Sequence, residues 1–245
     1  MKNIRKVINN YQNELQKINV ELGKVPAGRL IKRKTTFYHG FDGTEVGITK
    51  NEALIRQLCR KKYLLARKKQ IELNLKSPVG SWDLRTAVEL IASFSSAYQG
   101  VPKNYFYDPQ VEEWLNKPYT KNLYPMPALT YFSDNGIEYR TKSEVLVANV
   151  LERYELPFLY ETLFIVNKQR MFPDFVIKNP YHGRLIVWEH FGALDRADYE
   201  KKMNEKMINF RKGGYELGEN LIYTFESDVA DATRITELIE NVVLS

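Results

Sequence analysis

The sequence predicts an α/β protein in which a mixed sheet flanked by helices forms the C-terminal core, preceded by a basic helical and β-hairpin appendage. Three observations predict this architecture. Helical and strand-like hydrophobic periods alternate after residue 129, a heptad helix opens the chain, and positive charge is concentrated before residue 77. With 245 residues, 44% of them hydrophobic and 27% charged, the chain is long enough for one core and an appendage.

The composition excludes several classes of protein. No apolar run approaches the roughly 18 residues that cross a bilayer, and the first residues are too polar for a secretion signal. Cys59 is the single cysteine, so an intramolecular disulfide is impossible, and three histidines give no spacing for structural zinc. We therefore expect a cytoplasmic protein with no membrane partner.

The net charge of +6 is unevenly distributed along the chain. Residues 1–76 contain 18 Lys and Arg against 6 Asp and Glu, a balance of +12, which leaves 18 against 24, or −6, for the other 169 residues. This asymmetry is typical of a polyanion-binding module attached to a more neutral body, with a solvated helical surface as the alternative. We expect a nucleic-acid-binding region at 1–76, an aromatic-rich connecting region at 77–128 and the core at 129–245.

The appendage is expected to contain a helix, a hairpin and a second helix. Apolar residues recur at alternating spacings of 4 and 3 from Ile4 to Leu22, which is the pattern of a coiled-coil seam. Such a helix must pack on another helix of this chain or on a second copy, so a homodimer through it is one option. A strand at 29–38, a turn at 40–43 and a strand at 44–48 follow, and then a basic helix from 49 to about 74.

Cations characterise both the hairpin and the second helix. Few acids lie in the helix between residues 56 and 69, which favours contact with backbone phosphates over a face laced with salt bridges. The mixed basic and aromatic hairpin suits phosphates and stacked bases, with the hairpin's own packing as the alternative. The predicted nucleic-acid-binding residues are Lys32, Arg33, Lys34, Arg60, Lys61, Lys62, Arg67, Lys68 and Lys69.

Helices and strands then alternate toward the C-terminal end. An amphipathic helix near 83–98 and a short helix at 109–115, capped by Asp108, occupy the connecting region. The core is predicted to contain a helix at 141–154, strands at 158–166, 171–178 and 184–190, a helix from about Asp195 to 212, a strand at 220–225 and a helix near 231–242.

Two carboxylates stand in otherwise apolar strands. If the strands that contain Asp174 and Glu189 pair in antiparallel fashion, the two acids converge and repel each other unless a cation or a proton lies between them. Carboxylate oxygens with room for water suit Mg²⁺ or Mn²⁺, which would activate water and neutralise charge on a phosphodiester. The alternative makes Asp174 a turn residue after Pro173 and Glu189 a surface acid at a strand end.

Pro173 and Asp174, followed after 14 residues by Glu189 within an αβββαβ order, resemble the PD-(D/E)XK nuclease superfamily. The resemblance covers roughly residues 120–242. Fragments at 140–144, 160–161, 188–192 and 220–226 are similar to a group of bacterial and mobile-element proteins that carry this core. The resemblance implies a restriction-endonuclease-like fold and metal-dependent hydrolysis of DNA, with RNA left open as a substrate.

The resemblance also implies a role for an acid on the first core helix. In the superfamily such an acid often joins the metal shell, and Glu144 is the matching residue, although Thr141 and Glu144 also form a capping box. Arg140 and Lys142 beside it are expected to hold substrate phosphate. Glu161 is a lesser candidate, either drawn to the metal or on a partly exposed strand face.

One position departs from the superfamily pattern. The lysine expected two residues after the second acid is Phe191 here, and strand alternation directs His190 to the opposite face. Some members carry this lysine on the following helix, where Tyr199, Lys202 and Lys206 share a face. Lys206 is therefore the candidate, with an exposed charge-laced helix face as the alternative.

The leading hypothesis is a magnesium-dependent deoxyribonuclease. Glu144, Asp174 and Glu189 would bind the metal, and Lys206 would assist the attacking water or stabilise charge. Two alternatives remain: a nucleic-acid-binding protein that kept the fold and lost the chemistry, which the Phe191 departure favours, and an interaction protein whose N-terminal coiled coil recruits an effector.

Overall fold

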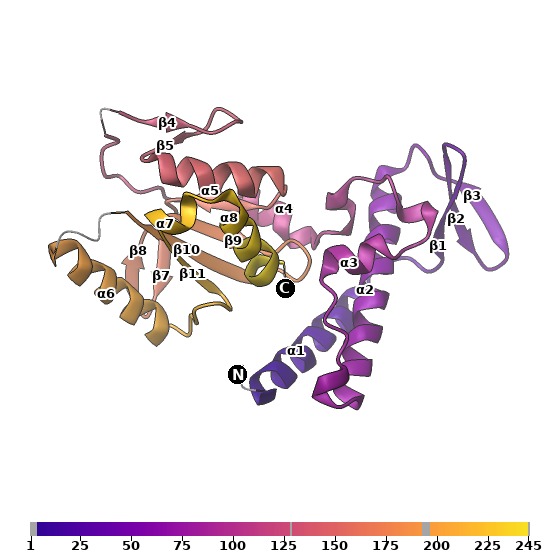
Figure 1. The fold of residues 1–245 in the computed structure, drawn as a ribbon. Coiled ribbons are helices and arrows are strands. Elements are labelled where there is room, and N and C mark those ends of the chain that lie inside the picture. The colour runs from indigo at the N-terminus through magenta and orange to yellow at the C-terminus, as the bar shows by residue number, and fades with distance from the viewer. Residues whose placement is uncertain (1–3, 128, 193–196, 245) are drawn as a thin grey trace. The chain divides into compact units, whose positions relative to one another are not determined.

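The chain has a mixed α/β fold, as the sequence predicts (Figure 1). The computed structural model describes residues 4–127, 129–192 and 197–244. The chain divides into two compact units, Met1–Asp108 and Pro109–Ser245. Residues 77–108 of the expected connecting region thus belong to the first unit, and residues 109–128 belong to the second. None of the described helices is both long and apolar enough to cross a membrane.

Two long helices form the body of the first unit, α1 (Ile4–Leu22) and α2 (Glu52–Lys76). They lie side by side (Figure 1), and Ile18 of the predicted heptad seam is buried. The seam therefore packs on another helix of the same chain, the first of the two partners that the sequence allowed. A homodimer through α1 stays a prediction.

A three-stranded antiparallel sheet connects the two helices, with β1 (Arg29–Arg33), β2 (Thr36–Phe41) and β3 (Thr44–Gly47) in sequential order. The prediction of one strand over residues 29–38 is wrong, because the chain reverses at Lys34, whose φ of 53° is a left-handed turn conformation. The second turn lies where it was predicted, with positive φ at Asp42 and Gly43.

The segment after α2 is less helical than its amphipathic pattern predicts. Its α-helix, α3, covers Ala87–Ala92 and not residues 83–98. Thr86 starts α3 with a capping box in which its hydroxyl accepts from Glu89 N and the Glu89 carboxylate accepts from Thr86 N. Single 3₁₀ turns at Val79–Ser81, Ser96–Tyr98 and Lys103–Phe106 complete the segment.

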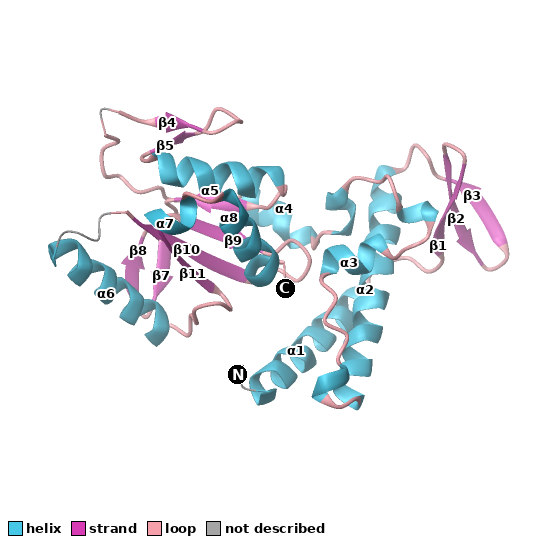
Figure 2. Cartoon of the chain, in the orientation of Figure 1, coloured by secondary structure: helices cyan, strands magenta, loops and turns pink. Residues whose placement is uncertain are grey.

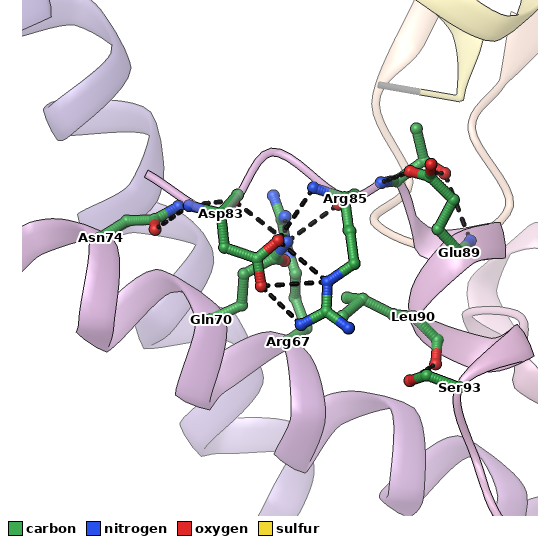
Figure 3. A network of polar contacts seen from close by, with 9 residues as sticks. Arg67, Gln70, Asn74, Asp83, Arg85, Glu89, Leu90 and Ser93 are labelled. Carbon is green, nitrogen blue, oxygen red and sulfur yellow. Dashed lines mark hydrogen bonds and ion pairs between the residues drawn. The ribbon is translucent and has the colours of Figure 1, made fainter. Parts of the chain in front are cut away.

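Side-chain amides of α2 fasten this segment to the first unit (Figure 3). Asn74 donates from Nδ2 to the Asp83 carbonyl at 2.9 Å and accepts from the Asp83 N–H at 2.8 Å. Gln70 donates to the Arg85 carbonyl at 2.9 Å. These bonds satisfy backbone groups that no helix or sheet partner reaches, which explains why residues 77–108 fold with the basic region.

The second unit is built on a four-stranded sheet in the order β11-β10-β9-β6 (Figure 2). Strand β10 pairs with β11 in parallel and with β9 in antiparallel fashion, and β9 pairs with β6 in antiparallel fashion. Its elements follow the predicted order: α4 (Pro109–Asn116), α5 (Lys142–Arg153), β6 (Phe158–Tyr160), β9 (Phe175–Lys178), β10 (Leu185–Phe191), α6 (Ala197–Lys212) and β11 (Leu221–Phe225). Asp195, the predicted start of α6, lies outside the described residues.

Two predicted strands are each interrupted. The predicted strand 158–166 divides into β6 and β7 (Phe164–Val166) at Glu161, where φ is +46°. The predicted strand 171–178 divides into β8 (Gln169–Met171) and β9 around Pro173, which has no N–H for a sheet ladder. Strands β7 and β8 pair as a separate hairpin. A two-stranded ribbon of β4 (Tyr131–Phe132) and β5 (Glu138–Tyr139) precedes α5.

Helices cover the sheet on its two faces. Phe210 of α6 is buried in a cluster with Val187 of β10 and Leu221 of β11, so α6 covers that face, and α5 lies on the other side (Figure 2). The predicted last helix is α8 (Ala232–Leu238), preceded by α7 (Glu226–Val229) and continued by a π-helical turn at Ile239–Val243.

Candidate active site

Glu189 is a buried acid on the α6 side of the sheet. Alternation along β10 places it on the same face as Val187, which packs on α6. The Glu189 side chain is 1% exposed, and the Lys206 Nζ atom of α6 lies 2.7 Å from its Oε2 atom. Lys206, predicted from its place on the helix after the acidic strands, therefore stands beside Glu189.

Asp174 lies next to Glu189 across the sheet. The antiparallel register of β9 and β10 pairs Phe175 with Trp188, so Asp174 and Glu189 are the next residues along the two strands. Asp174 Oδ2 accepts a hydrogen bond from the backbone N–H of His190 at 2.6 Å. The predicted convergence of the two acids is thus observed, and a backbone donor fixes the orientation of Asp174.

Among the described residues, Asp174 and Glu189 have less positive than negative charge around them. Burial, together with the nearby Asp174 carboxylate, raises the pKa of Glu189 to about 8, although Lys206 opposes the shift. Burial likewise raises the pKa of Asp174, against the influence of Lys206 and the His190 N–H. One lysine does not compensate two adjacent carboxylates, so the pair favours an additional cation or a bound proton.

One carboxylate oxygen of Glu189 is buried without a hydrogen-bond partner among the described residues. This arrangement of the Oε1 atom costs about 1–3 kcal/mol unless a ligand satisfies the oxygen. Carboxylate oxygens are the donors that Mg²⁺ and Mn²⁺ prefer. Asp174 and Glu189 therefore fit a divalent metal. In the described part of the chain, however, no group of three His, Cys, Asp or Glu residues is arranged to hold one.

Glu144 serves as a helix cap at the start of α5. Thr141 Oγ1 accepts from Glu144 N, and Glu144 Oε2 accepts from the N–H of Thr141 at 3.0 Å and from the Tyr160 hydroxyl at 2.9 Å. Burial raises the pKa of Glu144 to about 7, and Asp174 contributes to the shift. Glu144 is thus electrostatically coupled to the acidic pair, while the described contacts of its carboxylate are those of a capping residue.

Arg140 and Glu161 form an ion pair beside this cap. Arg140 Nε lies 2.8 Å from Glu161 Oε1, and both side chains are less than 15% exposed. The Arg140 guanidinium also donates to the carbonyls of Tyr124 and Pro125. These contacts leave the predicted role of Arg140 in phosphate binding without support, and they place Glu161 in a structural pair. Lys142 Nζ lies 5.6 Å from the centre of a tyrosine ring in β4.

The two residues after Glu189 take opposite sides of β10, as alternation predicts. Phe191 is buried with its ring centre 5.4 Å from that of Tyr223, so aromatic packing occupies the position of the missing lysine. The His190 ring lies on the other face, 3.3 Å from Glu226 Oε1, which also accepts from the Ser143 hydroxyl at 3.1 Å.

Sequence reasoning missed three polar residues near the acids. Tyr160 contacts Glu144 from β6, and Ser143 and Glu226 meet although 83 positions separate them. Each contact depends on how α5 lies on the sheet, and no local spacing in the sequence encodes that. A signal was available for all three, because Ser143, Tyr160 and Glu226 each lie in a fragment that resembles the nuclease superfamily.

In the first unit, the interpretation that the cations of α2 lack acidic partners is wrong for its three arginines, and Arg56 pairs with Glu52 of the same helix. Arg60 pairs with Glu21 through two bonds of 2.7 and 2.9 Å, and Arg67 pairs with Glu14 through bonds of 2.8 and 3.0 Å. Both acids come from α1, which the count within one helix could not include. Lys68 also contacts α1, through Asn19 Oδ1 at 2.7 Å.

Some of the other predicted phosphate-binding cations contact groups of the same unit, and others are exposed to solvent. Lys61 donates to the carbonyls of Pro26 and Gly28, and Lys62 lies 5.1 Å from the centre of the Phe94 ring. Lys34 and Lys69 are exposed, whereas Arg33 is exposed but paired with Glu45 and Lys32 lies 5.3 Å from the Phe37 ring centre.

Comparison with known proteins adds one partial similarity. Over 84 residues, 34% of this chain, the sequence is 34% identical to an uncharacterized protein of Methanocaldococcus jannaschii. The aligned segment spans 7% of that protein's length. No family model and no solved structure matches the chain.

Proposed function

We propose that this protein is a divalent-metal-dependent nuclease that hydrolyses phosphodiester bonds of DNA, and that its second unit is a variant of the restriction-endonuclease-like core. The order α5-β6-β9-β10-α6-β11 supports the fold, since it follows the αβββαβ order with the β7–β8 hairpin inserted after the first strand. The parallel pairing of β10 with β11 and the antiparallel pairing of β9 with β10 are compatible with a mixed sheet of this kind.

The observation that carries the proposal is the group formed by Asp174, Glu189 and Lys206. Two acids on adjacent strands meet a lysine from the following helix, and a buried Glu189 oxygen has no partner in the described residues. A structural ion pair would match each buried charge with an opposite one. A surplus of one buried carboxylate is instead the composition of a site that binds a cation.

In the proposed reaction, Asp174 and Glu189 hold the metal through carboxylate oxygens. Bound Mg²⁺ or Mn²⁺ supplies Lewis-acid activation of water and neutralises charge on the scissile phosphate. The His190 N–H keeps Asp174 oriented, because its 2.6 Å bond engages one carboxylate oxygen. Glu144 is assigned to the edge of the site, where it caps α5 and adds negative potential near Asp174.

Lys206 is proposed to act on the attacking water or on the phosphate. Its ammonium contacts Glu189 and its side chain is 34% exposed, so it spans the boundary between the buried acids and solvent. From there a cation can orient a water and stabilise negative charge that develops on phosphate oxygens. Phe191 does not prevent this role, because α6 delivers a lysine to the same face of β10.

A nuclease assay with matched variants tests the proposal. Purified full-length protein is incubated with supercoiled and linear DNA in Mg²⁺, Mn²⁺ or EDTA. We expect metal-dependent cleavage that falls by at least about 100-fold in Glu189→Gln and Lys206→Met, because each removes a charge from the site. Glu205→Gln and Lys202→Met, exposed residues of α6 with the same changes of charge, should retain full activity.

The assay also separates the proposal from its rivals. Equal activity in wild type and Glu189→Gln would overturn it. So would inert wild-type protein, and DNA binding that survives in Glu189→Gln would then favour a nuclease fold that binds nucleic acid without cutting it.

A further inference from the structure

The first unit contains a cavity of about 440 Å³ bounded by three elements. Strand β1 forms one wall, Leu58 to Leu65 of α2 form the floor, and the 3₁₀ turn at Ser96–Tyr98 forms the other wall. Its volume lies within the roughly 300–1,000 Å³ that is usual for ligand pockets. All residues that line this cavity belong to the first unit, whereas Asp174 and Glu189 belong to the second.

Four cations line this cavity, Arg29, Lys32, Lys61 and Lys62, and none of its described lining residues is acidic. The bidentate Arg60 and Arg67 pairs on the same helix lie outside the lining. The four cations of the cavity are thus distinct from the two arginines that acids of α1 neutralise. Cations confined to one concave site produce a stronger positive potential than the same charges spread over a convex surface.

The lining is held in place by the unit's own contacts. Lys61 Nζ donates to the Pro26 carbonyl at 2.8 Å and the Gly28 carbonyl at 3.1 Å, which ties the chain before β1 to α2. An ammonium group has three N–H donors, so one remains for a ligand. Tyr98 closes the opposite wall, and its hydroxyl accepts from the Leu30 N–H at 3.3 Å.

Two hydroxyl groups complete the set of donors. Ser95 and Ser96 line the cavity opposite the cations and are exposed. Phosphate oxygens accept hydrogen bonds from ammonium, guanidinium and hydroxyl groups together, and a site for a carboxylic acid or an apolar ligand would not need four cations.

We propose that this cavity binds a phosphate group through Arg29, Lys32, Lys61, Lys62 and the hydroxyls of Ser95 and Ser96. We assign this phosphate to the DNA backbone, and that assignment rests on the proposed nuclease function. A free phosphate ester would present the same chemistry, so the experiment compares both sources. Sequence reasoning spread phosphate binding over the whole basic region, whereas the cavity confines it to one site and adds Arg29 and the two serines.

Binding measurements in EDTA test the proposal without any cleavage. Fluorescence anisotropy with a labelled DNA duplex is measured over a range of salt concentrations for the full chain and two double variants. Arg29→Gln/Lys32→Gln removes two cavity cations, and Lys34→Gln/Lys69→Gln removes two exposed cations outside the cavity. We expect about tenfold or greater weakening and a salt slope smaller by about 2 in the cavity variant, and a clearly smaller change in the control.

Inorganic phosphate is the probe for the other source. Its stabilisation of the folded chain is measured as a shift in melting temperature, again for both double variants. If Arg29→Gln/Lys32→Gln loses this shift but binds the duplex as wild type does, the cavity is still a phosphate site. Its ligand is then a free phosphate ester and not the DNA backbone. Equal losses of duplex binding in the two double variants, with no difference in the phosphate shift, would overturn the proposal in favour of diffuse electrostatic attraction.

Single substitutions at Ser96 test the cavity without removing any of its cations, in case a double variant fails to fold. Ser96→Glu adds a carboxylate to the cavity without removing a cation, and Ser96→Ala is its conservative partner. Ser96→Glu should weaken the binding of whichever phosphate source the double variants identify, and Ser96→Ala, which removes one hydroxyl donor without adding charge, should weaken it by a smaller factor. Intact binding in Ser96→Glu would count against the cavity. Because no metal is present, an inactive nuclease site would leave this result unaffected.

Discussion

Among the described residues, buried charge is balanced between α1 and α2 of the first unit and unbalanced around Asp174 and Glu189 of the second. Between α1 and α2, Arg60 meets Glu21 and Arg67 meets Glu14, each through two hydrogen bonds. In the second unit, Asp174 and Glu189 share Lys206, and one Glu189 oxygen lacks a partner among the described residues. The same residue types thus fasten helices in one unit and leave a surplus of negative charge in the other.

The difference shows how to distinguish structural from functional charge. A bidentate pair of opposite charges compensates much of the desolvation that burial imposes, and such a pair needs nothing from solution. A buried carboxylate without its own cation keeps a raised pKa and has lower energy when a cation or proton joins it. The α1–α2 pairs are therefore assigned to folding, and the Asp174–Glu189 pair to a candidate site.

Breaking a balanced pair should have the largest effect on stability. Arg60→Met leaves Glu21 without its partner in a site where the arginine is 6% and the glutamate 25% exposed. We expect the first unit to lose about 2–3 kcal/mol, somewhat less than a fully buried pair because Glu21 reaches solvent. Urea unfolding monitored by circular dichroism measures the loss.

Two companion variants sharpen this result. Lys69→Met on the exposed side of α2 should change stability by less than about 0.5 kcal/mol. Arg60→Met/Glu21→Leu should recover most of the loss, because it removes the isolated charge. If Arg60→Met alone unfolds no more easily than Lys69→Met, the pair does not hold the helices together.

Neutralising Glu189 in the unbalanced site should change stability in the opposite direction, so that the variant is more stable than wild type at alkaline pH. The pKa of Glu189 is raised from its ordinary value of 4.5 to about 8, so the folded state binds a proton more tightly than the unfolded state. Stability from this group is therefore present below about pH 4.5 and is lost as pH rises to about 8. Glu189→Gln should match wild type near pH 4.5 and become progressively more stable than wild type as the pH rises to about 8.

Thermal melts across this pH range give the measurement. Glu205→Gln, which removes an exposed acid of α6, should follow the wild-type curve. A Glu189→Gln variant that is less stable than wild type at alkaline pH would mean that the Lys206 ion pair outweighs the repulsion from Asp174.

Metal binding should relieve the same surplus of charge. On the proposed function, millimolar Mg²⁺ or Mn²⁺ should raise the melting temperature of the wild type by a few degrees near pH 8.5, because a ligand that binds the folded state stabilises it by mass action. The shift should shrink toward pH 5, where protons compete for the carboxylates. Asp174→Asn and Glu189→Gln should abolish it, and an equal shift in these variants would assign the metal to another site.

The sequence was sufficient where local patterns determine structure. The heptad spacing predicted α1, the capping box predicted the start of α5, and two acids in apolar strands predicted the meeting of Asp174 and Glu189. Lys206 was found because the resemblance implies a lysine on the following helix, where the helical period puts it on one face with Tyr199 and Lys202. These features depend on periodicity within one element or on the pairing of adjacent strands.

Contacts between distant elements could not be predicted in the same way. The partners of Arg60 and Arg67 lie 39 and 53 positions away, so a count of acids within α2 suggested unpaired cations. Arg140 resembled a phosphate ligand because nothing in the sequence shows that the segment around Tyr124 returns to it. The interruption at Glu161 was missed because a glutamate at positive φ leaves no pattern in an apolar strand.

Glu144 combines features of a structural and of a functional charge. The smallest expected change in stability concerns this residue. Its carboxylate accepts from the N–H groups of Arg140 and Thr141 and from Tyr160, yet its pKa is raised to about 7 by burial and by Asp174. Glu144→Gln keeps an acceptor at the capping position, since glutamine also serves in capping boxes. We therefore expect a change in unfolding free energy below about 1 kcal/mol.

The stabilisation by Mg²⁺ then distinguishes the two roles of Glu144. If Glu144→Gln keeps the full thermal shift in Mg²⁺ near pH 8.5, the residue is a cap whose charge is incidental to the metal. If the shift falls as it does in Asp174→Asn, Glu144 belongs to the metal ligands as the sequence predicts, and its carboxylate must exchange a capping bond for the metal. Thr141→Ala, which loses the hydroxyl of the same cap and about 1 kcal/mol of stability, should leave the Mg²⁺ shift intact in either case and so controls for the loss of the cap alone.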